Sequence, residues 1–228
     1  MGLNAVIVGA GEGISAAFAR ALAKDGAKIA LAARDAGKLA DLAKQTAAIA
    51  IACDASQPAD VAALFQRVDR DIGPPDVVLF NASARARGPL VDLDPSDVAN
   101  ALAVGAFGGF LVAQEAARRM LPRAAGAIFF TGASASVKGY AQSAPFAMAK
   151  FALRGLAQSM ARELAPKGIH VAHFVIDGGV RSAQRSGGDT PDSLLDPDAI
   201  AQAYMSVLKQ PRSAWSWELE LRPWVEKF

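Results

Sequence analysis

Residues 5–15 read AVIVGAGEGIS, an apolar run that ends in closely spaced glycines and leads into an amphipathic segment. Glycine lets the backbone turn tightly and approach a pyrophosphate, and the N-terminus of a following helix offers unpaired N–H groups and a favourable dipole. A glycine triplet is weak evidence alone, but its position between a first strand and a first helix strengthens it. The alternative is a glycine-rich turn that binds nothing. The phosphate-binding residues predicted from this stretch are Gly9, Gly11, Glu12, Gly13 and Ile14.

Outward from this loop, short apolar runs alternate with longer amphipathic segments. The runs predict strands at Val6–Val8, Lys28–Ala33, Ala48–Ala52, Asp76–Phe80, Ala127–Phe130 and Ile169–Val175. The longer segments predict helices at Ile14–Lys24, Gly37–Gln45, Gln57–Asp71, Pro95–Leu121 and Ala144–Leu164. Continuous apolar strands are typical of a sheet covered on both faces, and the alternation indicates parallel strands with right-handed crossovers. We therefore expect an α/β fold: a single Rossmann domain over residues 1–228, with a doubly wound parallel β-sheet flanked by helices.

In such a sheet, ligands bind at the carboxyl ends of the strands. The polar, turn-rich stretch Arg185–Asp198 follows the sixth strand. It is either a lid over a substrate or a plain surface loop. A last helix at Pro197–Lys209 and a short strand near Glu218–Leu221 complete the expected fold.

Composition excludes several classes of protein. The chain has 228 residues, is 52% hydrophobic and carries a formal net charge of +2, which suits a globular enzyme-sized fold and gives no reason to expect nucleic acid as a partner. We expect neither a signal peptide nor an apolar run long enough to cross a membrane. Cys53 is the only cysteine, which points to a reducing cytoplasm. His170 and His173 point to opposite faces of a strand, so no metal site is predicted.

The glycine spacing carries a family resemblance. Gly9 and Gly13 fit G-x-x-x-G-x-G, with Ser15 in place of the last glycine. Asp54 follows the third strand, Asn81-Ala82 ends the fourth, and residues 177–182, DGGVRS, follow the sixth. In this order of elements the chain resembles the short-chain dehydrogenase/reductase family over essentially its whole length. The resemblance implies nucleotide contacts through Asp54, Ala55, Asn81, Ala82, Gly178 and Val180.

The end of the second strand bears on the choice of cofactor. A family member that prefers NAD carries an acidic residue there to bind the ribose hydroxyls. This chain has Ala33 followed by Arg34, and an arginine can pair with a 2′-phosphate through its planar fork. Glu12 counts against this assignment because a carboxylate would repel that phosphate. We favour NADP(H) over NAD(H).

The family's chemistry, as the resemblance implies it, uses four side chains: a tyrosine as proton donor, a lysine four residues later, a serine and an asparagine. Lys150 matches the lysine, which in the family also binds the nicotinamide ribose. The tyrosine position is Phe146, the serine position is Ala133, and the asparagine position is Gly105. The phenylalanine has no proton to give, and a positioned general acid contributes roughly 10²–10⁴ in rate.

Other groups are candidates for the missing relay. Ser134 lies one residue after the serine position, and Tyr140 lies in the loop before the catalytic helix, where it is either a proton donor or a surface tyrosine. With Lys150 they form the predicted catalytic set. Reduction of a conjugated C=C bond needs less from such groups, since hydride goes to carbon and solvent protonates the resulting enolate.

Basic residues gather in loops that follow the strands. Arg85, Arg87, Lys138, Arg181 and Arg185 predict a cationic rim for a substrate that carries carboxylate or phosphate; the alternative is scattered, solvated charges.

Two functions stay open. The first is an NADP(H)-dependent oxidoreductase with a non-standard proton donor, acting on a small or acyl substrate. The second is a catalytically inactive nucleotide-binding protein with a regulatory or partner-binding role. The resemblance also implies a homodimer or homotetramer paired through Pro95–Leu121 and Ala144–Leu164.

Overall fold

The computed structural model describes residues 2–183, 185 and 190–227. Its centre is a seven-stranded sheet of order β3-β2-β1-β4-β5-β6-β7, in which every neighbouring pair is parallel. The strands are β1 (Asn4–Val8), β2 (Lys28–Ala33), β3 (Ile49–Ala52), β4 (Val77–Phe80), β5 (Gly126–Thr131), β6 (Ile169–Ile176) and β7 (Glu218–Leu221). The predicted parallel sheet is confirmed, including the short last strand.

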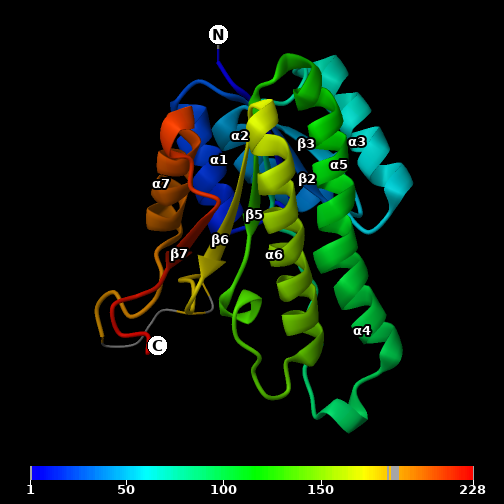
Figure 1. Ribbon diagram of the computed structural model, residues 1–228, viewed down its shortest axis with the longest axis vertical. Helices are drawn as coiled ribbons and strands as arrows, with labels where there is room; N and C mark the ends of the chain where they lie inside the picture. Colours follow the sequence, from blue (N-terminus) through cyan, green and yellow to red (C-terminus); the bar gives the residue numbers. More distant parts are fainter. Residues whose placement is uncertain (1, 184, 186–189, 228) are drawn as a thin grey trace.

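Helices cover both faces of this sheet (Figure 1). They are α1 (Ile14–Lys24), α2 (Ala40–Thr46), α3 (Pro58–Asp71), α4 (Pro95–Leu102), α5 (Gly108–Met120), α6 (Ala144–Leu164) and α7 (Pro197–Leu208). One buried cluster joins the sheet to α3, α5 and α6 through side chains such as Phe65, Val112 and Leu153. A second joins its other face to α1 and α7 through Phe18 and Tyr204. The expected doubly wound α/β fold is therefore correct.

The strand order places a crevice beside the glycine loop. The chain winds outward from β1 to β2 and β3, then returns to pair β4 with β1 on the other side and winds away to β7. The connections that follow β1 and β4 therefore lead away in opposite directions, which leaves a crevice between the carboxyl ends of these two strands. This is the switch point at which open α/β sheets bind ligands.

Two predicted helices have a more varied local structure. The segment predicted as Gly37–Gln45 begins with a 3₁₀ turn, Ala36–Leu39, that is capped by the side chain of Asp35. The segment predicted as Pro95–Leu121 is helical throughout, but Ala103–Phe107 forms a π-helical turn between α4 and α5. Such bulges relieve local crowding and are frequent at functional sites.

One expectation about membrane spans needs correction. The helical stretch Pro95–Arg123 is long and apolar enough to cross a membrane by length and composition, with a mean hydropathy of 1.4. Its buried side chains, among them Val112 and Ala116, pack into the cluster beneath the sheet. A core helix of a globular fold passes the same test of length and composition, so this property carries little weight.

The predicted lid is described only in part, since residues 186–189 of Arg185–Asp198 lie outside the described residues. After them, Leu195 is bonded to the loop that follows β6: its N–H donates to the Gly179 carbonyl over 2.8 Å, and its carbonyl accepts from Arg181 over 2.9 Å. The Trp224 indole N–H donates to the Pro191 carbonyl over 3.3 Å. The end of this segment is thus tied to the carboxyl edge of the sheet and to the C-terminal tail.

Candidate active site

Two adjoining cavities open at the carboxyl ends of the strands. The first has a volume of about 610 Å³ and extends from the glycine loop to the ends of β2 and β3. The second, of about 900 Å³, lies over β5 and β6 beside the start of α6. Asn81 and Ser83 line both cavities, so the two form one continuous cleft. Its length across the switch point suits an elongated ligand such as a dinucleotide.

The loop from β1 to α1 is built for close approach. Gly9 has φ +79°, and a Cβ on it would lie 2.3 Å from the backbone nitrogen of Ala82, so only glycine fits there. Gly11 and Gly13 face open space instead. Gly13 begins α1 without a side-chain cap, which leaves the first N–H groups of the helix free for an anion. These features fit a pyrophosphate.

Ser15 and Asn81 lock this loop to the sheet. The Ser15 hydroxyl donates to the Gly9 carbonyl over 3.1 Å, and the Asn81 amide donates to Ser15 Oγ over 2.8 Å and to the Gly9 carbonyl over 3.2 Å. Ser15 is buried, so the residue that replaces the motif's last glycine supplies an internal bond rather than a ligand contact. Asn81 holds the loop in shape while also lining the cleft.

The far end of the first cavity contains Asp54 and Ala55. The carboxylate of Asp54 accepts hydrogen bonds from the Ser56 N–H over 2.9 Å and the Ser56 hydroxyl over 2.7 Å. These bonds, aided by the charge of Arg34, lower the pKa of Asp54. An ionised carboxylate held in this way can accept from an adenine amino group.

A positive group stands at the end of β2. Arg34 lines the first cavity and makes no ion pair with any described residue. Lys38 lines the same cavity one turn later; its ammonium is 3.8 Å from the carboxylate of Asp35 and is largely exposed. Sequence reasoning missed Lys38, although its spacing of four from Arg34 was the available signal. Glu12 also lines this cavity and is exposed.

Lys150 is buried in the second cavity. It is only 3% exposed, and its ammonium donates to the Thr131 carbonyl at the end of β5 over 2.6 Å. Burial, and then the positive charge of Arg85, lower the pKa of Lys150 to about 8. A charge in such surroundings is costly unless a ligand balances it.

Phe146 lies one helical turn before Lys150, and two cationic side chains lie close to its ring. The Arg85 guanidinium carbon lies 4.1 Å from the ring centroid, and Lys150 Nζ lies 5.8 Å from it. Both distances fall within the range of cation–π attraction. The ring that carries no hydroxyl therefore serves as a support for Arg85, a role that sequence reasoning did not anticipate.

The other two relay positions have no suitable side chain. Ala133 has no hydroxyl, and its backbone N–H donates to Ser136 Oγ over 3.1 Å. A Cβ on Gly105 would lie 2.9 Å from the Cβ of Ala149, so the π-helical turn leaves no room for an asparagine. Neither position can take up the expected relay role without a change of sequence.

Ser134 and Tyr140 both line the second cavity. Ser134 lies next to Asp177. Burial alone would raise the pKa of Asp177, but its contacts with Ser134, Lys138 and Arg222 lower it overall. Tyr140 is 48% exposed and no hydrogen bond of its hydroxyl to a described residue is present. Ser134 is thus turned toward a buried carboxylate, and Tyr140 lies at the solvent side.

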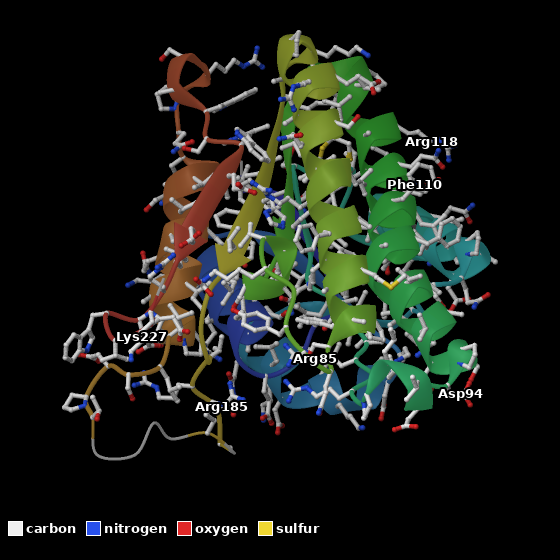
Figure 2. All side chains as sticks on the ribbon, turned by 60° about the horizontal axis from the view of Figure 1, so that its bottom comes forward. Arg85, Asp94, Phe110, Arg118, Arg185 and Lys227 are labelled. Carbon is white, nitrogen blue, oxygen red and sulfur yellow. The ribbon has the colours of Figure 1, made fainter. Side chains whose placement is uncertain are left out.

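The cationic rim divides into paired and unpaired members. Lys138 lies 3.1 Å from Asp177, and Arg181 pairs with Asp196. Arg85, Arg87 and Arg185 line the second cavity and make no ion pair with the described residues. Figure 2 shows Arg85 and Arg185 at the same end of the molecule. The rim at the cavity therefore consists of three arginines rather than five cations.

The loop after β6 and the C-terminal tail close the second cavity. Gly178 and Val180 line it, together with Ile14 from the start of α1. A Cβ on Gly178 would lie 2.7 Å from Pro223 and 3.3 Å from Glu226 Oε2. Glu226, which also lines this cavity, was missed because nothing in its local sequence indicates that the tail returns to the site.

The two histidines of β6 have structural partners. His170 stacks on Trp215, and its Nε2 is 2.9 Å from the Ser216 carbonyl. His173 Nδ1 is 3.0 Å from Glu218. Burial lowers the pKa of His173 to about 4. Among the residues that the structure describes, no three His, Cys, Asp or Glu side chains are grouped in a way that could hold a metal.

Comparison with known proteins agrees with this geometry. A family model described as short chain dehydrogenase matches residues 3–186. An uncharacterized oxidoreductase of Staphylococcus aureus (strain N315) is 28% identical over 223 residues, which cover 96% of each chain.

Two solved structures have the same fold over their whole length. A short-chain dehydrogenase from Rhodopseudomonas palustris superimposes with a TM-score of 0.86 at 36% identity, covering 98% of this chain and 100% of that one. A metagenomic short-chain oxidoreductase in complex with NADP gives a TM-score of 0.85 at 28% identity, covering 97% of each chain.

Proposed function

The chain belongs to the short chain dehydrogenase family, and from that membership we propose that it is an NADP(H)-dependent oxidoreductase with a non-standard proton donor. The observation that carries the proposal is the position of Lys150: buried in a cleft continuous with the glycine loop, beside a ring without a hydroxyl. The nucleotide-binding features are retained, whereas the tyrosine relay is not.

The preference for NADP(H) rests on charge at the end of β2. Arg34 and Lys38 line the adenosine end of the cleft, and residue 33 is alanine rather than an acid. The solved metagenomic relative has NADP bound, which supports the same choice. Glu12 lies in the same cavity, and its carboxylate weakens the attraction without removing it.

The nicotinamide, when bound, supplies or accepts a hydride. Lys150 would donate to the ribose hydroxyls or to a substrate oxygen, and its bond to the Thr131 carbonyl would orient it. Phe146 excludes water from the place where the family keeps a hydroxyl.

We propose that the substrate is a small or acyl compound with a conjugated C=C bond, because the carbon that takes the final proton can receive it from solvent. Ser134 and Tyr140 are the candidate donors for any protein-derived proton.

Unpaired arginines at the second cavity support an anionic substrate. Arg85, Arg87 and Arg185 line it, and among the described residues Glu226 is the one acidic side chain that does so. A cleft lined by one sign of charge concentrates ligands of the opposite sign.

We also propose that residues 1–228 act as one nucleotide-binding domain in the cytoplasm. Burial, then the nearby Asp60 and Asp54, raise the pKa of Cys53 to about 12, so its thiol is unreactive.

A titration followed by a turnover assay tests the proposal. NADPH fluorescence should change on binding, with a weaker response to NADH because Arg34 and Lys38 lose the 2′-phosphate. A panel of enoyl thioesters and 2-enoates should then cause a fall in absorbance at 340 nm. Absence of NADPH binding contradicts the proposal entirely.

The second candidate function is nucleotide binding without catalysis, which the absence of the relay at Phe146, Ala133 and Gly105 favours. Binding of NADPH without turnover of any enoyl, carbonyl or alcohol substrate would select it. The double variant Phe146→Tyr/Ala133→Ser separates the cases further. If only the relay is missing, ketone reduction should rise by at least about tenfold, toward the roughly 10²–10⁴ that a positioned general acid contributes. Ala133→Ser alone is the control and should change little.

A further inference from the structure

Phe146 and Arg85 form a unit that joins two distant parts of the chain. Arg85 follows β4, whereas Phe146 lies in the first turn of α6. The guanidinium lies over the ring at 4.1 Å, and Phe146 is only 9% exposed. An aromatic face this close attracts the guanidinium without using its N–H groups, which can still donate hydrogen bonds.

No acidic side chain that the structure describes neutralises Arg85. Arg85 makes no ion pair within the described ranges 2–183, 185 and 190–227. Burial, then Arg87 and Arg185, lower the pKa of Arg85, so its neighbours repel its charge rather than stabilise it. Lys150, on the same ring, adds a further positive charge. An arrangement of this kind costs stability in the free protein, which is typical of a site organised for a ligand.

We propose that Arg85, stacked on Phe146, binds the carboxylate of the substrate through two parallel hydrogen bonds. This assignment rests on the proposed function and names the chemical group that the second cavity recognises. The donors of a guanidinium lie in one plane, which suits two coplanar carboxylate oxygens. A phosphate can also accept two bonds from a guanidinium, so a phosphate ester is the probe that can contradict this assignment.

The assignment also gives the phenylalanine a positive role. A tyrosine at position 146 would direct a hydroxyl toward a substrate oxygen, whereas phenylalanine supports Arg85 through its ring without that hydroxyl. The residue that cannot serve in the relay thus still has a role in the proposed carboxylate subsite.

Calorimetry on the full chain saturated with NADP⁺ tests this subsite, because the oxidised cofactor prevents turnover. The probes are trans-2-hexenoate, its neutral amide and hexyl phosphate. The unaltered protein should bind the carboxylate at least about tenfold more tightly than the amide, since hydrogen bonds to charged groups are worth about 1.5–3 kcal/mol. It should bind the phosphate less tightly than the carboxylate.

Four variants test separately the charge of Arg85, the planar shape of its guanidinium and its support by the Phe146 ring. Arg85→Ala should weaken hexenoate binding at least about tenfold, and Arg85→Lys by nearly as much because it keeps the charge but loses the planar fork. Phe146→Leu should weaken it at least about threefold, since this largely buried cation–π contact is worth no less than an exposed one. Arg20→Ala removes the same charge from a surface pair with Asp198 and should leave the affinity unchanged. Thermal melts establish that each variant is folded.

Each result has one meaning. Equal affinity for the acid and the amide, tighter binding of hexyl phosphate, or full affinity in Arg85→Lys would overturn the carboxylate subsite while leaving the proposed function intact. Carboxylate binding that depends on Arg85, in a protein that reduces nothing, would support the subsite and count against the oxidoreductase. If NADP⁺ does not bind, the same titrations on the free protein decide the subsite alone.

Discussion

Lys150 carries a charge that its surroundings disfavour. Its pKa is lowered from 10.5 to about 8 by burial and by Arg85, so between these pH values the folded chain binds fewer protons than the unfolded chain. The resulting cost to stability is fully present below pH 8 and is relieved as the pH rises toward 10.5. A group kept at such a cost next to an open cleft is a candidate for function rather than for stability.

The pH dependence of cofactor affinity follows from this residue. Because Lys150 is an ammonium below its pKa of about 8 and a neutral amine above it, its attraction for an anionic nucleotide is lost as the pH rises. NADPH should bind up to about tenfold more weakly at pH 9 than at pH 7, measured by fluorescence titration. The phosphate ionises near pH 6, about one unit below this range, so it does not contribute.

Lys150→Met provides the control because it keeps an unbranched side chain of nearly the same length without a titrating group. Its affinity for NADPH should be lower than that of the unaltered chain at pH 7 and should not vary between pH 7 and 9. A similar pH profile in both proteins would assign the titration to another group.

Among the elements, the π-helical turn between α4 and α5 decides whether the family relay can be restored. Gly105 lies in this turn, with Ala149 of α6 opposite it. Gly105→Ala should reduce the free energy of unfolding by about 1–3 kcal/mol, since the added Cβ would meet that of Ala149 at 2.9 Å. Urea denaturation measures the change.

Gly155, in the middle of α6, offers a matched control. A Cβ there meets no atom within 4 Å, so Gly155→Ala should stabilise the protein by about 0.5–1 kcal/mol through helix propensity. Stabilisation by both substitutions would mean that the turn at Gly105 tolerates a side chain, and that the absent asparagine has no steric cause.

The same elements separate what the sequence predicted from what it could not. Strand positions, parallel pairing and the glycine loop followed from apolar periodicity and from the resemblance, since both depend on local pattern. The π-helical turn was missed because a fit between Gly105 and Ala149 involves two helices at once. The hydrogen bonds of Ser15 to Gly9 and Asn81 were missed because they join α1 to the ends of two strands, one of them far away in sequence.

At the scale of the whole molecule, the second cavity draws on segments that are far apart in sequence. Arg85 follows β4, Phe146 starts α6, and Glu226 comes from the tail after β7. Charge and ring type were visible in the sequence, but their pairing depends on how these loops meet at the carboxyl edge of the sheet. The rim of five cations was predicted as a group, and only folding shows that Lys138 and Arg181 are paired with acids.

The outer surfaces of α4, α5 and α6, which lie side by side in Figure 1, predict self-association. Phe107 and Phe110 are 46% and 42% exposed and stack on each other, and Met148 and Phe151 of the neighbouring region are 49% and 45% exposed. Large apolar side chains gathered in this way mark interfaces.

Light scattering should give at least twice the 23.6 kDa chain mass, and Phe110→Asp/Phe151→Asp should reduce it to one chain. Val91→Asp, at an equally apolar site that is 91% exposed, should leave the assembly intact. A 23.6 kDa species in the unaltered protein would contradict the prediction and leave this surface for another partner.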